Sequence, residues 1–265
     1  MDRFVSLDLD RVPSADAGIA ALSSAALYGK GVFTTVAIVG GQPFLWEKHK
    51  ARLRENAARI NFEFQQRLNE QLSAALTDII QHNGRREGRA RLTLFDSAGG
   101  GAWDNGLNNP PSILITTAGR SPCLRPHLSI SPHIVNSTSP LAGVKSCNYL
   151  EHLLALDEAK RNGFDESIRL NERGEVTSAC LANVFWCRGE KLFTPSLSTG
   201  CLAGTTREFI LESLNCVEVS EGIDAVREAD GVFLTSSGIG VVKAAELDGK
   251  DLRHCTHPIT SILPY

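Results

Sequence analysis

The stretch Val32-Phe-Thr-Thr-Val-Ala-Ile-Val39, followed by Gly40-Gly41, decides the fold class. Its β-branched residues predict a strand, and the glycine pair predicts a hairpin turn. We expect residues 44–46 to form the return strand and residues 47–60 to form a helix, because apolar side chains there recur at helical spacing. A hairpin that leads directly into an amphipathic helix predicts an α/β protein.

The rest of the chain continues this mixture of helices and strands. We expect helices over 65–83, 148–162 and 207–214, and strands over 89–95, 112–117, 128–135, 167–170, 176 onward, 183–186, 192–194 and 232–234. Between two of these strands lies a glycine-rich loop, 97–109, long enough to have a function. Turn formers cluster at 118–124, which predicts two domains, 1–118 and 119–265. The expected fold is α/β of the α+β kind, with mostly antiparallel strands.

Composition excludes several classes of protein. The 265 residues carry a formal net charge of −3, so the chain does not have the basic surface of a nucleic-acid-binding protein. No apolar run reaches the roughly 20 residues that a membrane span needs, and Met1-Asp-Arg-Phe4 does not resemble a signal peptide. Seven cysteines at irregular spacing, without a CxxC pair, predict reduced thiols, no metal site and a cytoplasmic location.

Gly29-Lys30-Gly31 has the glycine spacing of a dinucleotide-binding loop. That motif needs a strand before the glycines and a helix after them. Here the predicted strand follows the glycines, so we reject the dinucleotide-binding interpretation.

Two basic residues stand in suggestive contexts. Lys145 follows Leu141-Ala-Gly-Val144, and a lysine with apolar neighbours has a lowered pKa and can attack an aldehyde. Its local alternative is a surface lysine at the end of a loop. Arg52 shares a helix face with His49 and Asn56, and its planar guanidinium suits a phosphate, although the same face could be solvated.

Two hydroxyl-rich segments could bind an anion. Gly204-Thr205-Thr206 opens a predicted helix, whose first N–H groups and dipole attract phosphate, while Thr205 with Glu208 also fits a capping box. Thr235-Ser236-Ser237-Gly238 follows an apolar strand and could either hold phosphate oxygens or form a turn. Local sequence leaves both alternatives open.

The order of these segments resembles the class IV enzymes that use pyridoxal phosphate (PLP), which include branched-chain and D-amino-acid aminotransferases and aminodeoxychorismate lyases. The resemblance covers nearly the whole chain and rests on Tyr28-Gly-Lys-Gly-Val-Phe-Thr-Thr35, His49-Lys-Ala-Arg-Leu53, Val144-Lys-Ser-Cys-Asn-Tyr-Leu150, Gly174-Glu-Val-Thr-Ser178, Asn183-Val-Phe185, Thr194-Pro195, Leu202-Ala-Gly-Thr-Thr-Arg207 and Thr235-Ser236.

By this resemblance, Lys145 forms a Schiff base with PLP and moves the proton during catalysis. Arg52 and the helix start at Gly204, Thr205 and Thr206 hold the phosphate, and Thr235 and Ser236 complete its site. The resemblance also implies the two-domain fold type IV architecture with the cofactor in the interdomain cleft, a small-molecule amine as substrate, and a homodimer.

Departures from the family pattern bear on the reaction. Most of the family has a glutamate where Ser178 stands, and that glutamate keeps the pyridine nitrogen of PLP protonated; Glu175, three residues away on an extended segment, points to the other face. Thr34 occupies a position that is usually acidic in the aminotransferases, and the Phe-Thr-Thr version resembles the lyases. Thr34 could relay a proton near Lys145, or could be only a strand former. Lys30, where aspartate is common, is interpreted as a surface change.

The leading hypothesis is therefore a lyase that converts 4-amino-4-deoxychorismate into p-aminobenzoate and pyruvate in folate biosynthesis. The alternative is an aminotransferase acting on branched-chain or D-amino acids. Two non-enzymatic hypotheses are a PLP-binding protein that has lost catalysis and an unrelated binding protein. Arg89 and Arg91 are candidates for binding the substrate's carboxylates.

Overall fold

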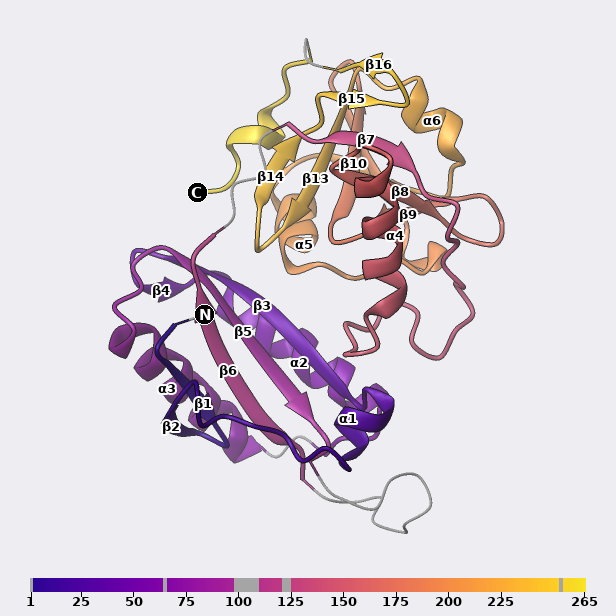
Figure 1. Ribbon diagram of the computed structural model, residues 1–265. Helices are drawn as coiled ribbons and strands as arrows, with labels where there is room; N and C mark the ends of the chain where they lie inside the picture. The colour runs from indigo at the N-terminus through magenta and orange to yellow at the C-terminus, as the bar shows by residue number, and fades with distance from the viewer. Residues whose placement is uncertain (1, 64–65, 98–109, 121–124, 253–254) are drawn as a thin grey trace. The chain divides into compact units, whose positions relative to one another are not determined.

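The computed structural model describes residues 2–63, 66–97, 110–120, 125–252 and 255–265 (Figure 1). Its contacts divide the chain into two compact units, the first made of Met1–Arg120 with Val144–Asn148 and the second of Ser121–Gly143 with Tyr149–Tyr265. The first stretch of the first unit ends at Arg120, close to the expected domain boundary after residue 118. The segment that contains Lys145 was expected in the C-terminal domain, but its contacts place it in the first unit.

Parts of two expected segments lie outside the described residues. These are 98–109 of the glycine-rich loop and 121–124 of the expected linker.

The first unit is built on an antiparallel sheet of six strands in the order β2-β1-β6-β5-β3-β4. Its strands are β1 (Phe4–Leu7), β2 (Asp10–Pro13), β3 (Gly31–Val39), β4 (Gln42–Pro43), β5 (Gly88–Phe95) and β6 (Ser112–Ala118). Its helices are α1 (Ser24–Tyr28), α2 (Trp46–Arg59) and α3 (Gln66–His82).

Alternate side chains of the central strands face α2 and α3 and form one core with them. That core includes Val36 and Leu92 from the sheet, Leu53 from α2 and Leu76 from α3. The expected return strand at 44–46 is wrong. The N–H of Phe44 still donates to the carbonyl oxygen of Ala37 in β3 at 2.8 Å, but Leu45 then adopts a left-handed backbone, with φ of 54°, and α2 starts at the next residue.

The second unit contains two five-stranded sheets, in the orders β12-β11-β10-β13-β14 and β16-β15-β7-β8-β9. Its strands are β7 (His127–Ile130), β8 (Glu166–Leu170), β9 (Val176–Ala179), β10 (Asn183–Arg188), β11 (Lys191–Pro195), β12 (Cys216–Val219), β13 (Gly231–Ser236), β14 (Gly240–Lys243), β15 (Glu246–Leu247) and β16 (Lys250–Asp251). Its helices are α4 (Leu150–Arg161), η2 (Leu197–Thr199), α5 (Thr205–Ser213), α6 (Ile223–Arg227) and η3 (Pro258–Ser261).

Apolar side chains from both sheets, among them Ile168 and Trp186, form the main core of this unit. A second core, with Phe185, Ile210 and Phe233, joins the first sheet to α5 and to Ile259 of η3. Three leucines of α4 are instead exposed, to 66% at Leu150 and 45% at both Leu153 and Leu154. The helix packs on β8 through smaller residues, with Ala155 and Ala159 buried.

Candidate active site

Backbone hydrogen bonds hold Lys145 on the edge of β3 that β5 does not occupy. The N–H of Phe33 donates to the carbonyl oxygen of Lys145 at 2.9 Å, and the N–H of Cys147 donates to that of Gly31 at 2.8 Å. On its other side, the N–H of Lys145 donates to Oδ1 of Asn56 in α2 at 2.7 Å. These bonds explain why the lysine segment belongs to the first unit, and they fix the lysine backbone.

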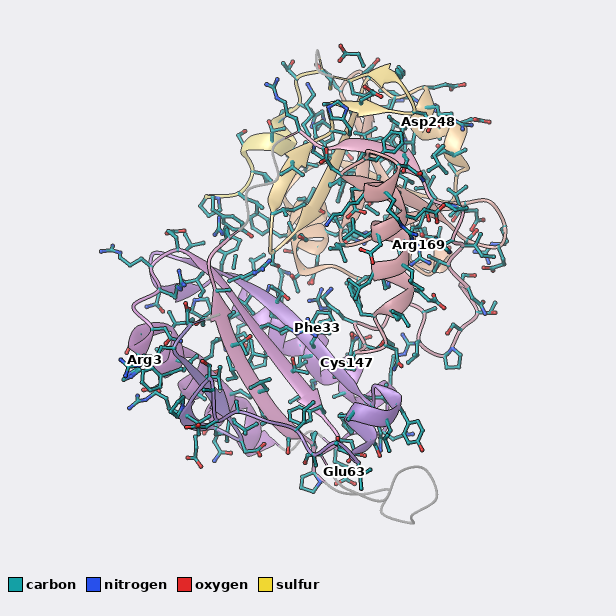
Figure 2. All side chains as sticks on the ribbon, viewed as in Figure 1. Arg3, Phe33, Glu63, Cys147, Arg169 and Asp248 are labelled. Carbon is teal, nitrogen blue, oxygen red and sulfur yellow. The ribbon has the colours of Figure 1, made fainter. Side chains whose placement is uncertain are left out.

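The amine of Lys145 lies over an aromatic ring and close to two arginines. Its Nζ is 4.6 Å from the centre of the Phe33 ring, and Cζ of Arg91 is 3.7 Å from the same centre. Figure 2 labels Phe33 together with Cys147 of the lysine segment. Burial, Arg52 and Arg91 lower the pKa of Lys145 to about 7. Near pH 7, Lys145 is therefore a neutral, nucleophilic amine in a large fraction of the protein molecules.

The polar face of α2 is buried, so the solvated-face alternative for Arg52 is wrong. His49, Arg52 and Asn56 are 1%, 8% and 4% exposed. Nη2 of Arg52 donates to Oγ1 of Thr34 at 2.8 Å, and Nδ1 of His49 lies 2.7 Å from the same oxygen.

The hydroxyl of Thr34 joins a guanidinium and a neutral imidazole ring. Burial, Arg52 and Lys145 lower the pKa of His49 well below its usual 6.5, so the ring is neutral. Because arginine only donates, the Thr34 oxygen accepts from Arg52, while the donor in the Thr34–His49 bond depends on which ring nitrogen of His49 carries the proton. Thr34 is therefore more than a strand former, since it links two buried side chains of α2.

In the second unit, α5 begins without a side-chain cap. Its N-cap is Gly204, whose carbonyl accepts from the N–H of Glu208 at 2.8 Å, so the expected capping box with Thr205 as the cap is wrong. A Cβ at position 204 would lie 2.0 Å from Oδ1 of Asn183, which excludes any larger residue there. The first N–H groups of a helix have no partner within the helix, and together with the helix dipole they favour binding of an anion.

Hydroxyl groups gather at this helix start. Oγ of Ser237 lies 3.4 Å from Oγ1 of Thr205 and 3.5 Å from Oγ1 of Thr206, both long for hydrogen bonds. Oγ1 of Thr235 is buried and has no hydrogen-bond partner in the part of the chain that the structure describes. We call Gly204, Thr205, Thr206, Thr235 and Ser237 the anion site. Its donors fit a phosphate group. In the first unit, the neutral amine of Lys145 fits an aldehyde, and PLP carries both of these groups.

Ser178 lies on β9, where it pairs with Arg169 of β8. Arg169, labelled in Figure 2, is only 1% exposed. Its Nε and Nη2 donate to the carbonyl oxygens of His133 and Ile134 at 3.2 and 3.1 Å, and Glu151 is 3.9 Å from Nη2. A buried cation therefore stands on the strand beside Ser178.

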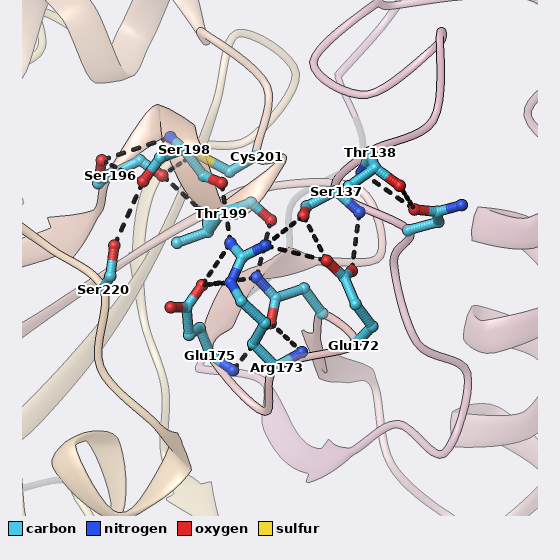
Figure 3. A network of polar contacts seen from close by, with 12 residues as sticks. Ser137, Thr138, Glu172, Arg173, Glu175, Ser196, Ser198, Thr199, Cys201 and Ser220 are labelled. Atoms are coloured by element: carbon cyan, nitrogen blue, oxygen red, sulfur yellow. Dashed lines mark hydrogen bonds and ion pairs between the residues drawn. The ribbon is translucent and has the colours of Figure 1, made fainter.

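Glu175 is engaged in a different network, shown in Figure 3. Its carboxylate accepts from Nη2 of Arg173 and from Nδ2 of Asn171, both at 2.7 Å. Nη1 of Arg173 also donates to Oγ of Ser137 at 2.7 Å and to Glu172 at 2.9 Å. These contacts agree with the expectation that Glu175 does not take the place of the missing glutamate at position 178.

Comparison with known proteins decides the family. The family described as amino-transferase class IV matches residues 31–247. The chain belongs to the class IV aminotransferases. This membership makes it a PLP-dependent enzyme and confirms the resemblance, the fold class and the cofactor expected from the sequence.

Relatives of this class IV enzyme carry different activities. An aminodeoxychorismate lyase of Bacillus subtilis is 30% identical over 248 residues, which are 88% of this chain and 83% of the relative. A branched-chain-amino-acid aminotransferase of Salmonella typhimurium is 27% identical over 256 residues, covering 88% of this chain and 81% of the relative. The crystal structure of the Escherichia coli branched-chain aminotransferase has the same fold, with a TM-score of 0.92 at 22% identity, covering 99% and 92% of the two chains.

The expected site residues of this class IV enzyme fall on both units. Thr34, Arg52 and Lys145 lie in the first unit, and the second carries the anion site, Ser178 and Ser236, a half-buried residue at the end of β13. Lys30, which the sequence analysis interpreted as a surface change, forms an ion pair with Asp96 at 2.8 Å.

Sequence reasoning gave Phe33 no role, named His49 and Asn56 only as neighbours of Arg52 on its helix face, and named Ser237 only within a hydroxyl-rich segment. Ser237 had a usable signal, since it continues the run of hydroxyl residues after β13. The other three show their roles only through tertiary contacts.

The described residues contain neither a membrane-spanning helix nor a cluster of metal ligands. No helix among them combines the length and the apolar character of a membrane span. No group of three or more histidine, cysteine and acidic side chains among them is placed to hold a metal ion.

Proposed function

We propose that this enzyme converts 4-amino-4-deoxychorismate into p-aminobenzoate and pyruvate. The observation that carries the proposal is Ser178, a neutral residue beside the buried cation Arg169, at the position where the resemblance expects a glutamate. A positive charge disfavours protonation of a nearby base. The pyridine nitrogen of the cofactor would then stay neutral.

Bound PLP supplies an electron sink for the bond changes at the substrate's amine-bearing carbon. A glutamate opposite the ring nitrogen strengthens that sink for transamination, whereas a serine weakens it. An elimination that releases pyruvate and leaves an aromatic ring needs the sink less. Ser178 therefore favours the lyase, in agreement with the 30% identical relative from Bacillus subtilis.

We assign the proton transfer to Lys145. Its pKa of about 7 lets the same amine accept and return a proton near neutral pH. The Thr34 hydroxyl bonds to both Arg52 and His49 and so orients these two side chains of α2. The neutral state of His49 lets this network act without adding another positive charge near Lys145.

The remaining donors hold charged groups. The anion site would bind the cofactor phosphate together with Ser236 and Arg52, as the family resemblance implies. Arg91, whose guanidinium shares the Phe33 ring with the Lys145 amine, would bind a substrate carboxylate. Arg89 was the other candidate for this role.

The test is release of p-aminobenzoate and pyruvate from freshly generated 4-amino-4-deoxychorismate by the PLP-loaded enzyme. Equal amounts of the two products, absent with Lys145→Ala, are expected. No release from protein that retains PLP would refute the lyase.

The alternative is an aminotransferase acting on branched-chain or D-amino acids, which the 27% identical relative supports. A single-turnover change in the cofactor spectrum on adding a simple amino acid to the wild-type enzyme would favour it. For the lyase we expect this change to be slow in the wild type and faster in Ser178→Glu, which restores the acidic partner of the ring nitrogen.

We also propose a cytoplasmic homodimer. Leu150, Leu153 and Leu154 form an exposed apolar face on α4, and contiguous apolar surface of this kind typically marks an interface. Light scattering should give twice the chain mass for the wild type and a monomer for Leu153→Glu/Leu154→Glu. A monomeric wild type would refute the dimer and leave the reaction proposal intact.

A further inference from the structure

Two cysteines far apart in the sequence meet in the second unit. Sγ of Cys187, in β10, lies 3.2 Å from Sγ of Cys255, which stands in the C-terminal segment. Cys187 is fully buried, whereas Cys255 is half-buried. This pair belongs neither to the anion site nor to the contacts around Lys145.

A glycine makes room for the pair. Gly231 of β13 is the strand partner of Cys187. A Cβ at Gly231 would lie 2.6 Å from Sγ and 2.8 Å from Cβ of Cys255. Any other residue at this position would push Cys255 away, so the backbone of β13 is shaped to admit the second thiol.

We propose that Cys187 and Cys255 are a dithiol site that peroxide converts reversibly into a disulfide. The S–S bond of a disulfide is about 2.05 Å long, so the two sulfur atoms need to approach by only about 1 Å. Intracellular disulfides of this kind are usually transient and redox-responsive. The site goes beyond the proposed reaction and does not depend on it.

The reaction balances with one molecule of hydrogen peroxide. The half-buried Cys255 thiol is oxidised first, to a sulfenic acid, with release of one water. The Cys187 sulfur then displaces the hydroxyl group from Cys255, so that the S–S bond forms and a second water leaves. Burial raises the pKa of Cys187 to about 12, which fits its place as the second, resolving thiol.

The disulfide would fasten the C-terminal segment to the sheet that carries part of the anion site. Nζ of Lys243 in β14 already donates to the carbonyl oxygen of Cys255. Further along the segment, Ile259 is buried in the core that contains Phe185 and Phe233. The segment ends at Tyr265, whose carbonyl oxygen lies 3.3 Å from where a Cβ of Gly240 would be. Gly240 is the strand partner of Ser236. The segment therefore extends from the thiol pair to the turn that carries Ser237.

The experiment treats reduced, PLP-loaded protein with a slight molar excess of hydrogen peroxide and measures intact mass and non-reducing peptide maps. We expect the loss of two hydrogen atoms, one linked peptide pair containing Cys187 and Cys255, and full reversal by dithiothreitol. Cys255→Ser and Cys187→Ser should abolish the link. Cys216→Ser, which replaces a cysteine of β12 in the same sheet, should leave it unchanged.

Two results would overturn the proposal. One is a wild-type protein in which Cys255 gains oxygen atoms but no link to Cys187 forms. The other is a link that persists in Cys255→Ser, which would assign the oxidation to other cysteines. Since Cys255 is half-buried, its serine variant should fold even if the buried Cys187→Ser does not, and the test then rests on Cys255→Ser.

Discussion

The surroundings of Lys145 and the anion site differ in how they treat a buried threonine. Thr34 and Thr235 are both inaccessible to solvent. The hydroxyl of Thr34 has two partners, at 2.7 and 2.8 Å, whereas that of Thr235 has none among the described residues. The first region is assembled before any ligand arrives, and the second keeps a donor available for one.

This difference has an energetic meaning. A buried polar group without a partner costs about 1–3 kcal/mol, so Thr235 destabilises the protein unless the bound phosphate that we propose there accepts its hydrogen bond. The contacts of Thr34 instead stabilise the fold whether or not a ligand is present. The comparison therefore separates the residues that we propose orient the reacting groups from those that we propose hold the cofactor.

The largest expected effect comes from Lys145→Ala, which removes the amine and leaves both threonine environments in place. We expect turnover to fall by about 10³-fold or more, because the nucleophile and the proton carrier are lost together. Lys30→Ala is the control, since its ion pair with Asp96 should contribute little to catalysis. Steady-state kinetics decide, and a larger loss in Lys30→Ala would contradict the assignment.

Thr34→Val tests the preassembled region. The valine keeps the shape of threonine but leaves Arg52 and His49 without their shared partner. We expect kcat to fall about 100-fold and the free energy of unfolding to fall by about 1–3 kcal/mol. The control is Thr77→Val in α3, whose hydroxyl bonds only to the carbonyl of Ser73. Equal kcat values for the two variants would remove Thr34 from the active site.

The pH dependence of PLP uptake tests the electrostatics of the same region. The apo protein should bind PLP covalently at a rate that rises about tenfold per pH unit below pH 7 and levels off above it, since only the neutral amine of Lys145 reacts. An ordinary lysine, with a pKa near 10.4, would keep gaining rate up to about pH 10. Absorbance-monitored reconstitution distinguishes the two profiles.

The same lowered pKa predicts how apo stability varies with pH. Between about pH 7 and 10.4 the unfolded chain keeps a proton that the folded Lys145 releases. Stability of the apo protein should therefore rise with pH across this window, as thermal unfolding would show.

The smallest effect is expected in the anion site, and it has the opposite sign for stability. Thr235→Val should leave the apo protein as stable as the wild type or slightly more stable, while weakening PLP binding by about tenfold. Thr194→Val is the matched control, because this equally buried threonine of the same sheet donates to the carbonyl of Val184 at 2.8 Å. It should lose about 1 kcal/mol of stability and keep its affinity for PLP.

Weaker PLP binding by Thr194→Val and unchanged binding by Thr235→Val would contradict the distinction between the two regions. Equilibrium titration with PLP and thermal unfolding of the apo proteins measure both quantities.

The sequence predicted the longer elements well because their patterns are local. The core strands β3 and β5 and the helices α2 and α3 follow directly from side-chain periodicity. The motif residues Lys145, Arg52 and Gly204 were found through the order of motifs, since local context alone left each of them ambiguous.

What the sequence could not show depends on contacts between distant segments. Nothing in the sequence around Phe33 indicates that a lysine more than a hundred positions later packs on its ring. Contacts between distant segments also determine three further features: the exposure of Leu153, the neutral state of His49 and the approach of Cys255 to Cys187. The short strands β14 to β16 also escaped prediction, because two to four residues carry too little periodicity.

The return of residues 144–148 to β3 has a consequence for how the enzyme is made. During synthesis all six strands of the first unit have been produced once Ala118 has left the ribosome, and domains generally fold as they emerge. The reactive amine reaches its place only after the chain has entered the second unit and come back. A nascent or truncated chain that ends before Lys145 would therefore carry all six strands of the first sheet but lack the amine that we propose captures the aldehyde.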